Sequence, residues 1–114
     1  METRPDPEQV YLSYCTCPDA ETAQTLAQTL VAEHLAACVT VLPGLISVYR
    51  WQAQIETDAE VLLLIKTTQA CVAALAARIE TLHPYDVPEV ISHPIITGNQ
   101  HYLDWVRQCT ANNH

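Results

Sequence analysis

The chain has 114 residues, a length that fits one domain, and 49% of the residues are hydrophobic. Its formal net charge of −8 argues against nucleic-acid binding, which needs a basic surface. No apolar run reaches membrane-spanning length, so no membrane partner is predicted. Five cysteines without a paired spacing argue against a disulfide framework and favour a reducing, cytoplasmic setting.

The first elements in the chain are a leader, a strand and a helix. Residues 1–9 are polar with two prolines, which predicts a disordered leader. Residues 10–16 alternate in hydrophobicity as a strand does. Asp19 then caps a helix over residues 20–36, whose apolar stripe includes His34.

Two further strands are predicted in the middle of the chain. The first covers residues 38–52 and is interrupted at Pro43 and Gly44. A polar turn is expected over residues 53–58, followed by a strand over residues 59–66. The run Val61 to Ile65 is apolar without alternation, which predicts that both faces of this strand are buried.

The second half of the chain begins with a helix that Thr68 caps and that ends at Leu82. A proline-rich segment over residues 83–89 follows, and then a strand over residues 89–97 that contains Pro94. Asn99 is expected to cap a short terminal helix.

The order β-α-β-β-α-β plus a terminal helix predicts an α+β fold, a ferredoxin-like βαββαβ sandwich. Right-handed crossovers give an antiparallel sheet of order 4-1-3-2 with both helices on one face. Pro43 and Pro94 then fall in the two edge strands, where proline is tolerated. The single domain covers residues 10–109, and residues 110–114 form a flexible tail.

This arrangement leaves one sheet face uncovered and two long edge strands unprotected, which soluble proteins usually avoid. Self-association would cover the face and pair the edges. In the alternative, the terminal helix with Trp105 covers the open face of a monomer.

The segment from His83 to Glu89 combines an imidazole, a phenol and two carboxylates between two stiffening prolines. It is a candidate site, or a connector whose His83 and Tyr85 only pack. Strand order brings Cys15 and Cys17 close to it, and this donor set suits copper or zinc. In the alternative, both cysteines are small buried hydrophobes.

Enzyme activity is not predicted. The only glycines are Gly44 and Gly98, so a phosphate-binding glycine loop is absent, and no nucleophile elbow occurs. A nucleophilic pair of Cys15 and His83 is conceivable, but no oxyanion donor supports it.

Several motifs together resemble the CutA family of divalent-cation tolerance proteins, over residues 10–106. They are Cys15-Thr16-Cys17-Pro18-Asp19, Leu35-Ala36-Ala37-Cys38-Val39, Tyr49-Arg50-Trp51, Lys66-Thr67-Thr68, His83-Pro84-Tyr85-Asp86-Val87-Pro88-Glu89 and Tyr102-Leu103-Asp104-Trp105. The resemblance implies a ferredoxin-like homotrimer, similar in subunit fold to PII signalling proteins, with a role in divalent-metal tolerance and with Cu²⁺ binding.

The family's copper ligands carry over to Cys15 and His83. Some members have a second histidine where this chain has Leu82, and Cys17 could compensate for it. Many members also have glycine where this chain has Ala53.

Three functions stay open. The first is a trimeric metal-binding tolerance protein with copper favoured, and zinc is another candidate ion. The second is a PII-like sensor that binds a small anion or metabolite between subunits, lined by Trp51, Lys66, Tyr85 and Glu89. The third is a scaffold that anchors other proteins.

Overall fold

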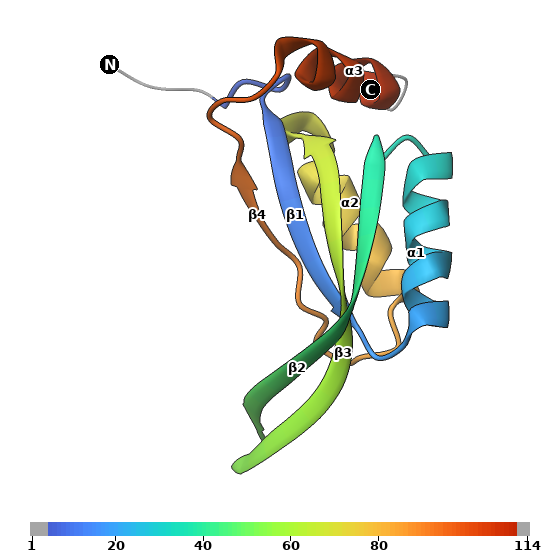
Figure 1. The fold of residues 1–114 in the computed structure, drawn as a ribbon, viewed down its shortest axis with the longest axis vertical. Helices are drawn as coiled ribbons and strands as arrows, with labels where there is room; N and C mark the ends of the chain where they lie inside the picture. The colour runs from blue at the N-terminus through green and yellow to red at the C-terminus, as the bar shows by residue number, and fades with distance from the viewer. Residues whose placement is uncertain (1–4, 112–114) are drawn as a thin grey trace.

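The computed structural model describes residues 5–111 (Figure 1). Its elements are β1 (Val10–Cys17), α1 (Ala20–Ala32), β2 (Cys38–Trp51), β3 (Gln54–Thr68), α2 (Gln69–Leu82), β4 (Ile91–Pro94) and α3 (Gln100–Thr110). Met1 to Arg4 of the expected leader and residues 112–114 of the expected tail lie outside the described residues. None of these helices is both long and apolar enough to cross a membrane.

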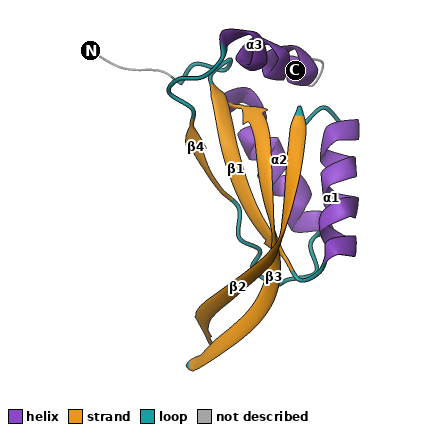
Figure 2. Ribbon diagram, viewed as in Figure 1, coloured by secondary structure: helices purple, strands orange, loops and turns teal. Residues whose placement is uncertain are grey.

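The four strands form one antiparallel sheet in the order β2-β3-β1-β4, which confirms the predicted fold (Figure 2). Both central strands, β1 and β3, are paired on each side. In the register of these two strands, Cys15 lies opposite Leu63 and Cys17 lies opposite Val61. The four residues therefore share one face of the sheet, because opposite partners in an antiparallel pair point the same way.

The main core lies between this face and the helices α1 and α2. Its fully buried members include Leu26 and Leu30 of α1, Leu75 and Ile79 of α2, and Leu63. Phenylalanine is absent from the chain, so aliphatic side chains fill this core. Burial of this apolar area is the main term that stabilises the subunit.

Helix α1 ends at Ala32, four residues before the predicted end. His34 adopts a left-handed conformation with φ 61° and lies exposed instead of on the apolar stripe. The Leu35 N–H donates to the Leu30 carbonyl at 3.0 Å, and the His34 N–H donates to the Val31 carbonyl at 3.1 Å. These two bonds form a Schellman motif, which reverses the chain toward β2.

Helix α2 begins after Thr68, as predicted, but the Thr68 side chain makes no capping hydrogen bond. Instead, the Gln69 N–H donates to the Gln9 carbonyl at 2.8 Å, and the Ala70 N–H donates to the Pro7 carbonyl at 3.1 Å. The segment before β1 thus satisfies two free amides at the first turn of α2.

Strands β2 and β3 continue past the sheet as a two-stranded arm, which projects at the bottom of Figure 1. The predicted turn over residues 53–58 is wrong, because pairing extends to Trp51 opposite Gln54. Only Gln52 and Ala53 form the turn, both with positive φ. The register shifts between Leu42 and Leu45, where Pro43 and Gly44 interrupt the ladder as expected.

The open face of the sheet is not covered by α3. That helix lies across one end of the sheet (top in Figure 1), where Val106 packs with Val10 and Ala37. Trp105 remains 42% exposed. On the open face, Leu62 and Leu64 are only half-buried. The prediction that both faces of β3 are buried is therefore wrong for this face of the single chain.

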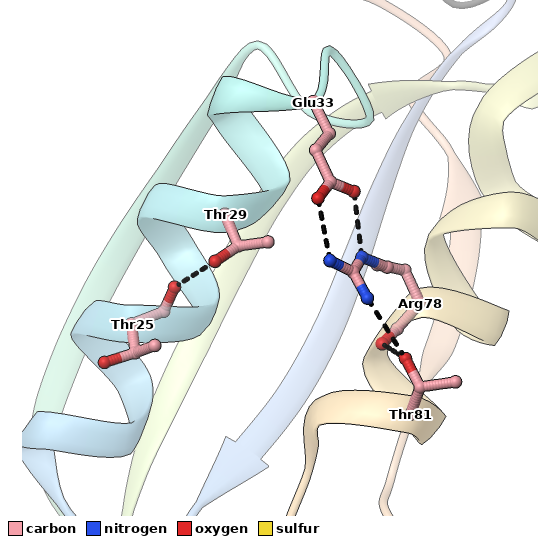
Figure 3. A network of polar contacts seen from close by, with 5 residues as sticks. All are labelled: Thr25, Thr29, Glu33, Arg78 and Thr81. Atoms are coloured by element: carbon pink, nitrogen blue, oxygen red, sulfur yellow. Dashed lines mark hydrogen bonds and ion pairs between the residues drawn. The ribbon is translucent and has the colours of Figure 1, made fainter.

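Strand β4 pairs with β1 over only four residues and ends at Pro94, so this edge is shorter than predicted. On the helix side, Glu33 and Arg78 link α1 to α2 (Figure 3). The guanidinium donates two hydrogen bonds, at 2.9 and 2.8 Å, to the two carboxylate oxygens.

Candidate metal site and adjoining cleft

Cys15 and Cys17 lie at the end of β1, two residues apart on the face that packs against the helices. Both side chains are fully buried and both are free thiols. With His83 they form a group whose candidate ligand atoms all lie within 4.8 Å of one another. The expected approach of the cysteines to the proline-rich segment is therefore observed.

His83 follows directly after α2, and its extended backbone matches the restriction that Pro84 imposes. The buried ring uses both nitrogens. Nδ1 accepts a hydrogen bond from the Tyr85 N–H at 3.1 Å, and Nε2 lies 2.8 Å from the Thr16 carbonyl. Because a carbonyl only accepts, Nε2 must carry the proton, and this arrangement specifies the neutral Nε2–H tautomer.

The two thiols differ in proton affinity. The adjacent Cys17 thiol, together with burial, raises the pKa of the Cys15 thiol well above its usual range. The adjacent Cys15 thiol lowers the pKa of Cys17. Both sulfurs are therefore candidate metal donors once they are deprotonated. Sequence reasoning gave the main role to Cys15, although the same-face spacing already indicated Cys17.

The donor set fits a soft metal ion. Thiolate and imidazole are ligands of copper and zinc, with metal–sulfur distances of about 2.3 Å, so that two ligands of one ion lie about 4 Å apart. The observed group needs only a small contraction to reach that spacing. Use of His83 Nε2 would require its proton to leave and the bond to Thr16 to break, so the thiols are the primary donors.

A second feature lies on the opposite side of β1. A cleft of about 710 Å³ opens on the helix-free face, between the base of the arm and the segment after α2. Trp51, Tyr85 and Glu89, three of the four predicted pocket residues, line it. Thr16 also lines the cleft, while its neighbours Cys15 and Cys17 point to the other side.

Lys66, the fourth predicted pocket residue, is not in this cleft. It pairs with Leu12 and Cys38 at the other end of the sheet, as the direction of its strand indicated. Its ammonium group donates to Thr40 Oγ1.

The cleft contains a residue that sequence reasoning missed. Glu60 is buried at the base of the arm and accepts a hydrogen bond from the Tyr85 hydroxyl at 2.8 Å. Its position beside an apolar run carried no signal in the sequence. Tyr85 thus joins the two sites, because its backbone contacts His83 and its hydroxyl contacts Glu60.

The fold and the thiol–imidazole group define a small ferredoxin-like protein with a candidate soft-metal site. The sequence model of the CutA1 divalent ion tolerance proteins matches residues 11–109. The chain therefore belongs to this family, which confirms the resemblance seen in the motifs.

Two curated relatives show the extent of the similarity. The chain is 52% identical over 96 residues to the divalent-cation tolerance protein CutA of Thermus thermophilus, covering 84% of this chain and 93% of that protein. It is 44% identical over 104 residues to protein CutA of Homo sapiens, covering 91% of this chain but only 58% of that protein. The Thermus relative is named for divalent-cation tolerance.

Solved structures agree with the fold. CutA from Xylella fastidiosa has a TM-score of 0.87 at 47% identity, covering 90% of this chain and 98% of that chain. The divalent cation tolerance protein of Thermus thermophilus has a TM-score of 0.86 at 48% identity, covering 89% of this chain and 98% of that chain.

Proposed function

We propose that this protein is a homotrimeric divalent-cation-binding protein of metal tolerance that takes up copper through Cys15, Cys17 and His83. The observation that carries the proposal is the buried group of two thiols and an imidazole. The name of the Thermus relative, a divalent-cation tolerance protein, supports the same function. Copper is favoured because it ranks highest among divalent ions for such donors and has affinity for sulfur.

The trimer is supported by apolar side chains that the single chain leaves in water. Ile46 on the arm is 72% exposed, and Ile96 after β4 is 94% exposed. Leu62 and Leu64 are half-buried on the open face of the sheet. Second and third copies of the chain would cover these apolar side chains. We place the protein in the cytoplasm, because the free thiols require a reducing setting.

Metal binding is tested by calorimetry on reduced protein under anaerobic conditions, with zinc as a redox-inert probe and copper(I) in competition. The Cys15→Ser/Cys17→Ser variant should bind at least about tenfold more weakly than the wild type. Cys71→Ser is the matched control, since Cys71 is buried elsewhere and contacts Thr110. Equal binding by the double variant and the wild type would contradict the proposal.

The assembly is tested by light scattering at low micromolar concentration. The expected mass is three times the subunit mass of 12.7 kDa. Ile46→Glu should reduce the mass to that of one subunit while the helical signal is kept, because Ile46 lies on the arm outside the core. A wild-type monomer would refute the trimer and leave the metal site to be judged separately.

A further inference from the structure

The cleft contains a buried carboxylate that has no cation partner among residues 5–111 of the single chain. Glu60 is only 7% exposed, and its one hydrogen bond comes from the neutral hydroxyl of Tyr85. The ion pairs found in residues 5–111 join other side chains. A buried carboxylate is unfavourable unless a cation or several hydrogen bonds compensate it.

The second oxygen of Glu60 faces the cleft. Every fully enclosed side-chain oxygen or nitrogen among the described residues has a hydrogen-bond partner. Oε1 of Glu60 accepts no such bond there, so it is open to the cavity that Glu60 lines. This oxygen is a free acceptor at the base of a cleft large enough for a small molecule.

The charges around the cleft favour a cation. Asp86 and Glu89 line it together with Glu60, against the single cation Arg50. The sequence had also suggested an anionic ligand. These carboxylates would repel it, and Lys66 could not offset the repulsion because it lies at the far end of the sheet.

Aromatic rings form another part of the wall. Trp51, Tyr49 and Tyr85 line the cleft, and the faces of such rings attract organic cations. The Tyr49 hydroxyl donates to Asp58, which raises the pKa of Tyr49 to about 12 and keeps the ring neutral. A hard divalent ion such as Mg²⁺ or Ca²⁺ would gain nothing from these rings, because it prefers a shell of oxygen ligands.

We propose that this cleft binds a small organic cation, an amine or guanidinium compound. Its charged head pairs with Glu60, and its alkyl body lies against Trp51 and Tyr49. The site is independent of the thiol group, although Tyr85 contacts both Glu60 and His83.

The test is a titration with agmatine and cadaverine, with 1,5-pentanediol and glutarate as the neutral and anionic matches. It uses reduced full-length protein in the presence of a chelator. Trp51 fluorescence in a Trp105→Phe background reports occupancy of the cleft, and calorimetry gives the affinity.

Only the two amines should bind saturably. Glu60→Gln should weaken them roughly thirtyfold or more, since truncating one partner of a buried charge pair has effects of that order.

Glu80→Gln is the matched control, because it removes the same charge from an exposed position on α2. It should bind the amines as the wild type does. Without ligand, Glu60→Gln should melt at or above the wild-type temperature, because glutamine still accepts from Tyr85 and carries no charge.

Three results would overturn the proposal. They are the lack of saturable amine binding by the wild type, equal binding of the diol, and unchanged amine binding by Glu60→Gln. One stability measurement would also overturn it. If Glu60→Gln, Arg50→Gln and the double variant all lost the same melting temperature, Arg50 of another subunit would already pair with Glu60.

Discussion

The Nε2–H of His83 donates to the carbonyl of Thr16 at 2.8 Å, and Thr16 lies between the two thiols of the candidate site. The same ring accepts the Tyr85 N–H on Nδ1. His83 therefore holds the loop after α2 against the end of β1. Its metal-free role is structural, and a metal would have to displace one of these bonds.

This geometry predicts the protonation state of His83 in the reduced, metal-free protein. Nitrogen NMR of the ring should show the neutral tautomer with the proton on Nε2, because both hydrogen bonds depend on it. Exposed His101 serves as the internal reference for a ring in solvent. A proton on Nδ1 of His83 would contradict the arrangement described for the site.

Leu63→Asp should prevent folding. Leu63 is fully buried between the sheet and both helices, and an unpaired carboxylate there costs several kcal/mol, comparable with the whole stability of a domain. Circular dichroism and the soluble yield measure the outcome. Ala77→Asp, at an exposed position of α2, should fold normally. A folded Leu63→Asp protein with an unchanged melting temperature would show that β3 is in a different register.

Ala53→Gly should stabilise the arm. Ala53 adopts φ 66° in the two-residue turn, a conformation that glycine enters without strain. We expect a gain of about 0.5 kcal/mol in the free energy of unfolding, since the relieved strain exceeds the added chain entropy. The measurement is a urea melt. Ala74→Gly, the same change at an exposed position inside α2, should instead lose about 1 kcal/mol.

The Glu33–Arg78 pair predicts a pH dependence. The Arg78 guanidinium lowers the pKa of Glu33 from its usual value near 4.5. The unfolded carboxyl thus takes up its proton at a higher pH than the folded one. The pair stabilises the protein above the unfolded pKa, and this small contribution is lost as the pH falls through the folded pKa.

Urea midpoints of the wild type and Arg78→Met should therefore differ at neutral pH and converge in acid below the usual pKa of Glu33. In a Glu33→Gln background the Arg78→Met change should give the same small difference at every pH. A difference that grows in acid would contradict the assignment.

The fold could be predicted from the sequence because the apolar pattern and the topology rules agreed. The strand that contains the run Val61 to Ile65 was predicted from that pattern, although only Val61, Leu63 and Ile65 of the run lie in the core. The arm could not be predicted in this way, because residues 54–58 are exposed on both faces and carry no hydrophobic alternation. The end of α1 was missed since a histidine, not a glycine, takes the left-handed position after it.

The candidate metal site could be predicted in part, because Cys15 and His83 lie on elements whose relative positions the topology fixes. The opposite pKa shifts of the two thiols were not predictable, since they depend on the closeness of two buried side chains. The contribution of Glu60 was also missed, because it depends on the exact reach of Tyr85 across the sheet.

The ladder between β2 and β3 is interrupted between Leu42 and Leu45, at the base of the arm. From Leu45 to Trp51 the strand extends for roughly 20 Å, at about 3.3 Å per residue. A tilt of about ten degrees at this point would move the Trp51 backbone by about 3.5 Å. Trp51 and Tyr49 form one wall of the cleft, while Tyr85 and Glu89 belong to the loop opposite. A change in the tilt of the arm would therefore change the width of the cleft.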